Sequence, residues 1–504
     1  MTDDRRTPVI IGVGEICDRP DDPFDGLESR QLMHAAIAAA ERDSTLSLRD
    51  KIDWLGVEDQ ISFPDPEIAD RLASELPSRP PRVVKTEDAS GDGPVRLIND
   101  AANLIAEGEI SVAVGVGGEA LRTANKRAQI EKSKGKAPTS KTNLIAELAA
   151  RSARPLARAY GLLTPIDVYP LYENATRAAW GQTFVEAQAE TAAIWSGFSQ
   201  VASQNPMAWL RTPKSEADIL CDDPGNPMLS FPYRKLMVAN GSVNMGAAVI
   251  VTSLAFAREN SVPENRIVYV GRGAASHEPD DFLARDSYEH SASLSASISK
   301  TLEFNGLDAS DIDCVELYSC FPCIPKMARR VLNWPLSKPH SVYGGLTFGG
   351  GPIGNCMAHA AARMVLKLRG GDRNGMIVAN GGYATHNHAI VLSGSPARSV
   401  QCAMDYRVDD TAATLRKKQP ALLKGYEGGP GTIETFVAPF ARDGRANHAT
   451  IVARNEAGDR FLATIDGDDR KAIERLTASD AQPVGCAGMA SPMPDGRLRW
   501  DFRS

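Results

Sequence analysis

Apolar residues in the first 400 positions fall into short runs that alternate with longer amphipathic stretches. Several of these runs are apolar almost throughout, which is typical of strands covered on both faces. They lie at 8–14, 53–59, 110–118, 246–253, 266–273, 313–319, 375–382 and 388–394. Between them, helical periodicity occurs at 29–43, 94–108 and 355–371, and more weakly at Ser291–Phe304. This alternation predicts an α/β architecture.

Two segments of the chain share one layout. Residues 89–120 and 347–384 each read as a Gly-rich turn, a helix, a short gap and a strand that ends in Gly-Gly. Both helices begin near a Gly-Pro pair, where proline suits the first turn. The alternative is a chance similarity between two unrelated units. We expect a duplicated α/β domain, because the period of more than 200 residues is too long for a solenoid.

The pattern of apolar and polar residues changes after residue 400. Residues 401–431 read as a polar linker with a short helix. From Thr432 onward, short alternating runs are separated by turn signals such as Asp443-Gly444 and Pro494-Asp495-Gly496. This predicts a small, barrel-like, all-β domain. The expected organisation is an N-terminal half (1–262, with a helical and basic region at 120–215), a C-terminal half (263–400) and a β-domain (413–504).

Composition and charge exclude some classes of protein. The 504-residue chain is 43% hydrophobic and 24% charged, which is ordinary for a soluble globular protein. A net charge of −7 argues against a general nucleic-acid binder, whose surface is strongly basic. No apolar run is long enough for a membrane span, and the N-terminus lacks the regions of a signal peptide. We therefore expect a cytoplasmic protein whose eight cysteines are mostly free thiols.

Residues 122–142 form a basic segment in this otherwise acidic chain. Such a run is usually a solvated loop or helix face, although it can also bind a polyphosphate ligand. Its basic residues are Arg122, Lys126, Arg127, Lys132, Lys134, Lys136 and Lys141.

The stretch Tyr318-Ser319-Cys320-Phe321-Pro322-Cys323 follows a predicted strand and leaves four interpretations open. A redox pair works at a helix N-terminus, but the folds that use one are much smaller than this chain. A structural zinc site needs four ligands, and no second C-x-x-C motif occurs. A third interpretation is structural, with both cysteines as buried thiols that pack in the core. A nucleophile needs a base or a helix dipole, together with donors for an oxyanion.

Other segments could supply those groups. The loop Gly349–Gly351 enters a helix, so its backbone N–H groups could face a developing negative charge. Three of the eight histidines lie close together in sequence, at His359, His386 and His388. Each one taken alone is more often structural than catalytic, but their clustering favours a functional site.

With these motifs, the sequence resembles the thiolase superfamily over about residues 7–395. Thiolases carry a Gly-Gly…Gly-His-Pro-x-Gly loop, and Gly344–Gly354 occupies that place. Sterol-carrier-protein type thiolases carry His-Asp-Cys-Phe after a strand, and Tyr318–Phe321 occupies that place. Asn240–Ser253 resembles the strand that closes the first half of the thiolase fold. The resemblance implies a duplicated fold with five layers, αβαβα.

A subgroup, the thiolase-like proteins of type 1, is similar in more detail. These proteins are often named acetyl-CoA acetyltransferases and carry an added C-terminal β-domain, which matches residues 413–504. The shared motifs include Val168–Ala175 ("VYPLYENA"), the loop at 344–352 and the strand at 380–388. Together they are specific for fold and subfamily, and much less specific for the reaction.

Three departures from thiolases bear on the mechanism. The thiolase nucleophile is a cysteine just before the helix that begins here near Pro94; its place falls most closely on Ala89, and no cysteine is nearby. Gly351 replaces the histidine of the Gly-His-Pro loop. The second thiolase cysteine falls around Gly381–Tyr383, where no cysteine occurs. The usual mechanism with two cysteines is therefore not supported.

The resemblance implies a CoA-dependent acyltransferase that cleaves or forms a C–C bond in a β-keto acid or β-ketoacyl thioester. Cys320 would be the nucleophile or acid/base, with His359, His386 or His388 as its proton partner. Tyr318 and Ser319 would donate hydrogen bonds, and Gly349–Gly351 would stabilise an enolate. The basic segment, from Arg122 to Lys134, would contact the phosphates of CoA, and no metal would be required.

Two further expectations follow from the resemblance. Thiolases are usually dimers, so a homodimer is expected unless the added β-domain covers the interface. A different class of function also stays open, because the missing cysteine and histidine are what a decayed enzyme would show. In that case the chain is a non-catalytic acyl-CoA-binding or scaffold protein.

Overall fold

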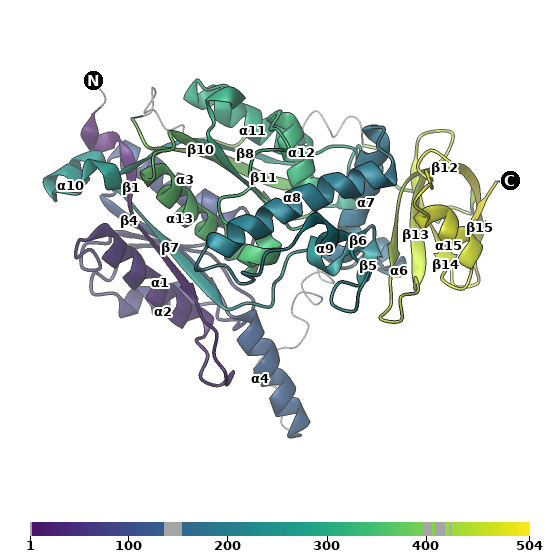
Figure 1. The fold of residues 1–504 in the computed structure, drawn as a ribbon, viewed down its shortest axis with the longest axis horizontal. Coiled ribbons are helices and arrows are strands. Elements are labelled where there is room, and N and C mark those ends of the chain that lie inside the picture. The colour runs from purple at the N-terminus through teal and green to yellow at the C-terminus, as the bar shows by residue number, and fades with distance from the viewer. Residues whose placement is uncertain (1–2, 136–153, 397–405, 409–418, 424, 504) are drawn as a thin grey trace.

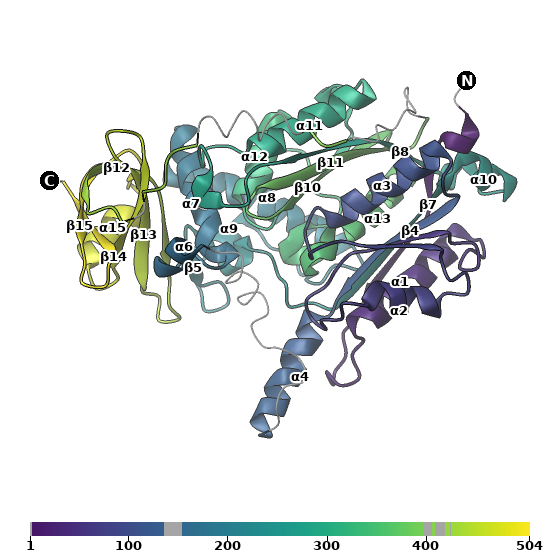
Figure 2. The ribbon, with the colours of Figure 1, turned by 180° about the vertical axis from the view of Figure 1, so that it is seen from behind.

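Layers of helices and strands in the order αβαβα make up most of the molecule (Figures 1 and 2). The computed structural model describes residues 3–135, 154–396, 406–408, 419–423 and 425–503. Within these residues no helix is long and apolar enough to cross a membrane.

The first half of the fold contributes five strands to the main sheet, in the order β3-β2-β4-β7-β1. The strands are β1 (Pro8–Cys17), β2 (Trp54–Val57), β3 (Arg82–Lys85), β4 (Val112–Glu119) and β7 (Met245–Ser253). β2 runs parallel to β3 and β4, whereas β7 is antiparallel to β4 and β1. The helices of this half are α1 (Ser29–Ser44), α2 (Ile68–Glu75), α3 (Gly93–Glu107) and α10 (Leu254–Glu259).

The second half repeats this plan in the order β8-β11-β10-β9. Its strands are β8 (Val268–His277), β9 (Cys314–Leu317), β10 (Asn374–Gly381) and β11 (His386–Ser393). Its helices are α11 (Ala292–Asn305), α12 (Cys323–Val331) and α13 (Cys356–Arg369). The halves meet where Val9 and Ile10 of β1 pair with Tyr269 and Val268 of β8, which gives one nine-stranded sheet.

The duplicated helices α3 and α13 lie side by side between the two halves of the sheet (Figure 2). Their small buried residues, such as Ala101 and Ala102 on α3 and Ala360 and Ala361 on α13, let the helices fit into this central layer. α3 precedes β4 and α13 precedes β10, so the two segments with a shared layout occupy matching places. The predicted duplication of an α/β unit is therefore confirmed.

A long insertion separates β4 from β7. It contains α4 (Leu121–Ser133), α6 (Pro155–Ala159), α7 (Pro165–Ala179), α8 (Phe184–Gln204), α9 (Glu216–Leu220), β5 (Met228–Phe231) and β6 (Tyr233–Arg234). α4 projects away from the layers, whereas α7 and α8 cross beside the second half (Figure 1). Single 3-10 turns lie at Asp4–Arg6, Lys235–Met237, Glu264–Arg266, Phe282–Ala284, Ala309–Asp311 and Ile353–Asn355, and a π turn lies at Gly345–Gly349.

The C-terminal part is a closed barrel of five strands, as the alternating pattern predicted. Its strands follow each other around the barrel as β12-β13-β14-β16-β15, and β15 pairs with β12 again. They are β12 (Gly429–Pro439), β13 (His448–Arg454), β14 (Arg460–Asp466), β15 (Ala487–Pro492) and β16 (Leu498–Phe502). The sequence pattern did not indicate the helix α15 (Arg470–Thr477), which buries Ile473 and Leu476 in the barrel.

Three kinds of contact hold the barrel against the rest of the fold. The far end of β12 pairs with β5, with Ala438 opposite Phe231. The Thr435 hydroxyl donates to the carbonyl of Leu171 on α7 over 2.5 Å. Arg460 is fully buried, and it donates to backbone carbonyls at positions 283 and 285 of the body and to a carboxylate on β12.

Candidate active site at the start of helix α3

Cys320 lies in the short turn between β9 and α12 and is 9% exposed. The hydroxyl of Tyr169, on α7, lies beside its thiol. The same hydroxyl donates to the carbonyl of Gly382 over 3.0 Å and accepts from the Asn380 amide over 3.1 Å. Elements of the second half and of the insertion therefore converge on this cysteine.

Burial keeps the Cys320 thiol protonated. It raises the pKa to about 12, although the neighbouring Tyr169 hydroxyl and backbone N–H groups oppose the shift. A thiol is a strong nucleophile only as the thiolate, so near neutral pH this group does not supply one. Cys323 is also buried, and burial raises its pKa well above the ordinary value.

Tyr318 and Ser319 pack into the protein interior beside Cys320. The Tyr318 hydroxyl lies beside the Cys356 thiol at the start of α13, and a Cβ atom at Gly91 would approach that hydroxyl within 2.3 Å. The Ser319 hydroxyl accepts from the backbone N–H of Leu346 over 3.0 Å. The Ser319 side chain therefore holds the segment at Leu346 in place, and Gly91 lets the turn before α3 approach Tyr318.

The predicted oxyanion loop uses its N–H groups within the fold. The Gly349 N–H donates to the Gly344 carbonyl over 3.2 Å, and the Gly351 N–H donates to the Asn240 carbonyl over 2.9 Å. The Gly350 carbonyl accepts from the Tyr343 hydroxyl over 3.0 Å. These bonds stabilise the loop, and they occupy two of the donors that an oxyanion would need.

The three candidate histidines lie in two different places. His359 is fully buried on α13, where its Nδ1 lies 3.0 Å from a carboxylate oxygen of Glu15 on β1. His386 and His388 begin β11. In the part of the chain that the structure describes, none of the three hydrogen-bonds the Cys320 thiol. The expected pairing of Cys320 with a histidine is therefore not present in this geometry.

His386 and His388 border a pocket of about 420 Å³ with mixed polar and apolar walls. The turn before α3 also lines it, through Ser90 and Asp92. His386 Nε2 lies 2.6 Å from the Asp280 carboxylate, and its ring stacks on that of His277. This pocket has an ordinary volume for a small-molecule site, and its polar groups come from distant parts of the chain.

The two pocket histidines differ in electrostatic environment. His388 is 1% exposed and stacks on Tyr406 with ring centroids 5.0 Å apart. Burial lowers its pKa to about 3, so this imidazole is neutral near pH 7. His386 is partly exposed, and its partner Asp280 orients the ring. A neutral imidazole and an imidazole oriented by a carboxylate suit hydrogen bonding and proton transfer, respectively.

Sequence reasoning missed the groups at the start of α3. It placed the position of the thiolase nucleophile at Ala89, but the residue that lines the pocket there is Ser90. The Ser90 hydroxyl bonds to the Asp92 carboxylate, which is 8% exposed. A serine and an aspartate that flank a glycine just before a helix are a weak signal in one sequence, because such turns are common.

The basic segment is helical where the structure describes it. α4 carries Lys126 and Lys132, and Lys134 is the residue that caps its C-terminus; Lys132 and Lys134 are exposed. The Arg127 guanidinium is already hydrogen-bonded within the fold, because it donates to the Glu28 carboxylate and to backbone carbonyls at positions 23 and 26. Arg122 lies over the ring of Trp209, at 5.7 Å from its centroid. Lys136 and Lys141 lie outside the described residues.

Within the described residues, no group of three or more histidine, cysteine, aspartate or glutamate side chains could hold a metal ion.

The comparisons with known proteins match both parts of the fold. A family model described as the thiolase-like protein type 1 additional C-terminal domain matches residues 413–491. A crystal structure of a monomeric SCP2-thiolase like protein type 1 from Mycobacterium smegmatis has 26% identity and a TM-score of 0.81, and the match covers 100% of both chains. None of the curated proteins matches the chain.

Two further solved structures cover the part of the chain before the barrel. The Ltp2-ChsH2(DUF35) aldolase has 18% identity and a TM-score of 0.61, with 77% of this chain and 98% of that chain covered. Human mitochondrial 3-ketoacyl-CoA thiolase in complex with CoA has 15% identity and a TM-score of 0.58, with the same coverage. At these identities the likeness concerns the fold alone. The chain thus has the thiolase fold and carries the additional C-terminal domain of thiolase-like protein type 1, which confirms the resemblance that its sequence motifs indicated.

Proposed function

We propose that this chain is a CoA-dependent acyltransferase that cleaves or forms a C–C bond in a β-keto acid or β-ketoacyl thioester. The reaction centre is the pocket at the start of α3, and Cys320 is not the nucleophile. The observation that carries the proposal is the convergence of Ser90, Asp92, His386 and His388 on one pocket of about 420 Å³. The thiolase fold supports the reaction class, since solved neighbours of this fold include a thiolase crystallised with CoA.

The chemistry fits a direct attack by CoA in the cleavage direction. The CoA sulfur adds to the β-keto carbonyl carbon, so a C–S bond forms. The bond between the α and β carbons then breaks, and its electron pair becomes an enolate. His386, oriented by Asp280, takes the thiol proton and returns it to the α carbon. No acyl-enzyme forms, so this route does not need the cysteine that the chain lacks at the thiolase position.

Negative charge develops on oxygen twice in this route, in the tetrahedral adduct and in the enolate. The positive end of α3 faces the pocket, because Ser90, Asp92 and Gly93 all line it. The Ser90 hydroxyl and the neutral His388 ring are uncharged hydrogen-bonding groups in the same wall. Groups fixed in advance around the reacting oxygen stabilise such charges most effectively.

The lysines of α4 and of its C-cap remain our candidates for contact with CoA phosphates. Lys126 and Lys132 lie on this projecting helix, Lys134 caps its C-terminus, and Arg127 joins the helix to Glu28. Replacing both Lys132 and Lys134 by glutamate should weaken CoA binding several-fold at low salt and have less effect at high salt. Calorimetry at two salt concentrations measures this, and an affinity equal to that of the wild type would exclude the contact.

Turnover measurements with matched variants test the site. Purified protein is incubated with CoA and a panel of β-keto acids and β-ketoacyl-CoA thioesters, and free thiol and acyl-CoA are quantified. His386→Gln should lower kcat by about 10²–10⁴-fold, the usual contribution of a general base. Cys320→Ala should leave kcat unchanged. Turnover that is lost in Cys320→Ala and kept in His386→Gln would refute the assignment.

A second function is favoured by a specific observation. The buried, protonated thiol of Cys320, together with Gly351 in place of the thiolase histidine, is what a protein without Claisen activity would carry. We propose as the alternative a non-catalytic acyl-CoA-binding or scaffold protein. CoA binding by calorimetry without turnover of any substrate in the panel supports this alternative.

A further inference from the structure

Glu58 follows β2 and is 1% exposed, with its carboxyl group wedged between the two duplicated helices. Its Oε1 accepts from the backbone N–H of Ser90 over 2.8 Å. A Cβ atom at Gly93, the first residue of α3, would approach Oε2 within 2.0 Å. A Cβ atom at Gly354, just before α13, would approach Oε1 within 2.4 Å. Only glycine therefore leaves room for this carboxyl group at either helix start.

We propose that Glu58 is the positioning residue of Ser90, and that it acts together with one water molecule bound between its carboxyl group and Asn355. The two groups join the start of α3 to the start of α13 and thereby hold Ser90 at the pocket. This inference does not depend on the reaction proposed above, because it concerns the backbone that carries Ser90.

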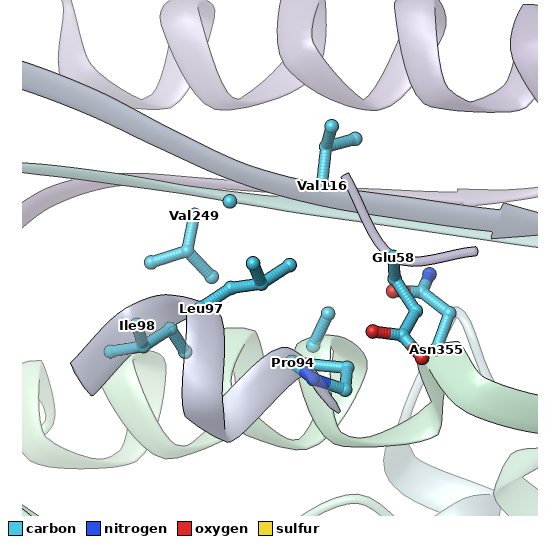
Figure 3. Close-up of a pocket in the computed structure, with 9 residues that line it drawn as sticks. Glu58, Pro94, Leu97, Ile98, Val116, Val249 and Asn355 are labelled. Atoms are coloured by element: carbon cyan, nitrogen blue, oxygen red, sulfur yellow. The ribbon is translucent and has the colours of Figure 1, made fainter. Parts of the chain in front are cut away.

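The evidence for the water molecule is a small cavity with two unsatisfied oxygens on its wall. The cavity measures about 10 Å³, which is close to the smallest volume that holds one water molecule. Glu58 and Asn355 border it together, with the apolar side chains of Leu97 and Val249 opposite (Figure 3). Glu58 Oε2 and Asn355 Oδ1 have no hydrogen-bond partner among the described residues. Buried polar atoms are rarely left unpaired, and a water that hydrogen-bonds to both oxygens would satisfy them.

Asn355 is itself fixed, so it can serve as the far end of this bridge. Its Nδ2 donates to the carbonyl of Gly117 on β4 over 2.8 Å. A Cβ atom at Gly117 would approach the Asn355 Oδ1 within 2.3 Å. The amide is therefore locked between β4 and α13, with its oxygen toward the cavity (Figure 3).

The surroundings of Glu58 favour its protonated form. Burial raises its pKa well above the ordinary value, and the charges of Asp92, at the start of α3, and of Asp59 raise it further. The Ser90 N–H and the Thr86 hydroxyl oppose this shift. Cys356, at the start of α13, is another titratable group nearby. A protonated carboxyl group can donate to the water and still accept from Ser90, as a glutamine amide also can.

Hydrogen exchange measured by mass spectrometry tests the positioning role. In Glu58→Ala, amides of residues 86–98 should exchange about tenfold faster, the effect of losing one buried hydrogen bond. Glu58→Gln should exchange like the wild type. The matched control is Glu316→Ala, which removes another buried glutamate with one unpaired oxygen, and it should change exchange only around residues 341–349.

Two results would overturn the proposal. One is unchanged exchange at 86–98 in Glu58→Ala, or a change no larger than in Glu316→Ala. The other is a Glu58→Gln variant that behaves like Glu58→Ala, since the carboxylate charge would then be required.

Infrared spectroscopy and crystallography test the proton and the water independently. At pH 7 the spectrum of the wild type minus that of Glu58→Gln should contain the carbonyl band of a buried protonated carboxyl group. A high-resolution crystal structure should show one water between Glu58 and Asn355. A direct contact between the two side chains would refute the bridging water. A carboxylate band in place of the carbonyl band would show that Glu58 is ionised and would refute its protonation. Neither readout needs turnover, so failure of the proposed reaction would leave these results unaffected.

Discussion

Glu316 offers a quantitative test of the electrostatics inside this fold. It lies on β9 and is fully buried. One carboxylate oxygen accepts from the Ser341 hydroxyl and from the N–H groups of Val342 and Tyr343, over 2.7–3.0 Å. The other oxygen has no partner among the described residues. Burial raises the pKa of Glu316 from 4.5 to about 7, despite the three hydrogen bonds.

The perturbation is Glu316→Gln, which reproduces the shape of the protonated acid. Because the folded chain keeps a proton that the unfolded chain releases above pH 4.5, the wild type loses stability as the pH rises towards 7. At about 1.36 kcal/mol per pH unit, the loss is about 0.8 kcal/mol at pH 5 and about 3.3 kcal/mol at pH 8. Glutamine does not titrate, so the variant should gain about 2.5 kcal/mol relative to the wild type between these pH values.

Urea denaturation followed by tryptophan fluorescence, at pH 5 and at pH 8, measures the two free energies of unfolding. Glu216→Gln is the control, because Glu216 is exposed and should show no such change. A difference between Glu316→Gln and the wild type that is equal at both pH values would refute the reasoning. So would a difference that falls as the pH rises.

Three further predictions address the thiol, a buried ion pair and the barrel. Iodoacetamide at pH 8 should label the exposed Cys221 at least about a hundredfold faster than the buried Cys320. Mass spectrometry measures the two labelling rates, and similar rates would contradict the burial of Cys320. Lys326→Met should cost about 3–5 kcal/mol of stability, because it leaves the buried Glu173 carboxylate without its cationic partner, and adding Glu173→Leu should restore much of that loss. If the double variant did not regain stability, the ion pair itself would be stabilising. Arg460→Ala should make limited proteolysis release the barrel earlier than in the wild type, because it removes hydrogen bonds to two backbone carbonyls of the body; an unchanged cleavage pattern would assign the docking to other contacts.

Much of the fold could be predicted from the sequence, because buried strands and helices leave a clear pattern of apolar residues along the chain. The eight apolar runs of the body correspond to strands, and the helices at 29–43, 94–108 and 355–371 occur where periodicity indicated them. Several short elements were missed, among them α2, α9, α10, α12, α15, β3, β5 and β6. These elements are stabilised by contacts with distant segments, as where β5 pairs with β12, and local patterns carry little trace of such contacts.

The candidate site could be predicted less completely from the sequence, because its residues come together only in the folded chain. His386 and His388 were chosen because they cluster in sequence, and the structure brings them to Ser90 instead of Cys320. Burial of Cys320 raises its pKa, and the sequence could not indicate this because the enclosing ring of Tyr169 comes from a helix about 150 residues away. Glu58 resembles a surface glutamate in sequence, and only the packing of two helix starts around it reveals an interior group.

The pairing of β12 with β5 has a mechanical consequence. One end of β12 belongs to the barrel wall, and the other end is joined to the insertion by backbone hydrogen bonds. A load applied to the C-terminus would therefore pass through these bonds into the body. The barrel and the layered body should yield together under force, so the division visible in the sequence near residue 413 does not coincide with a mechanical joint.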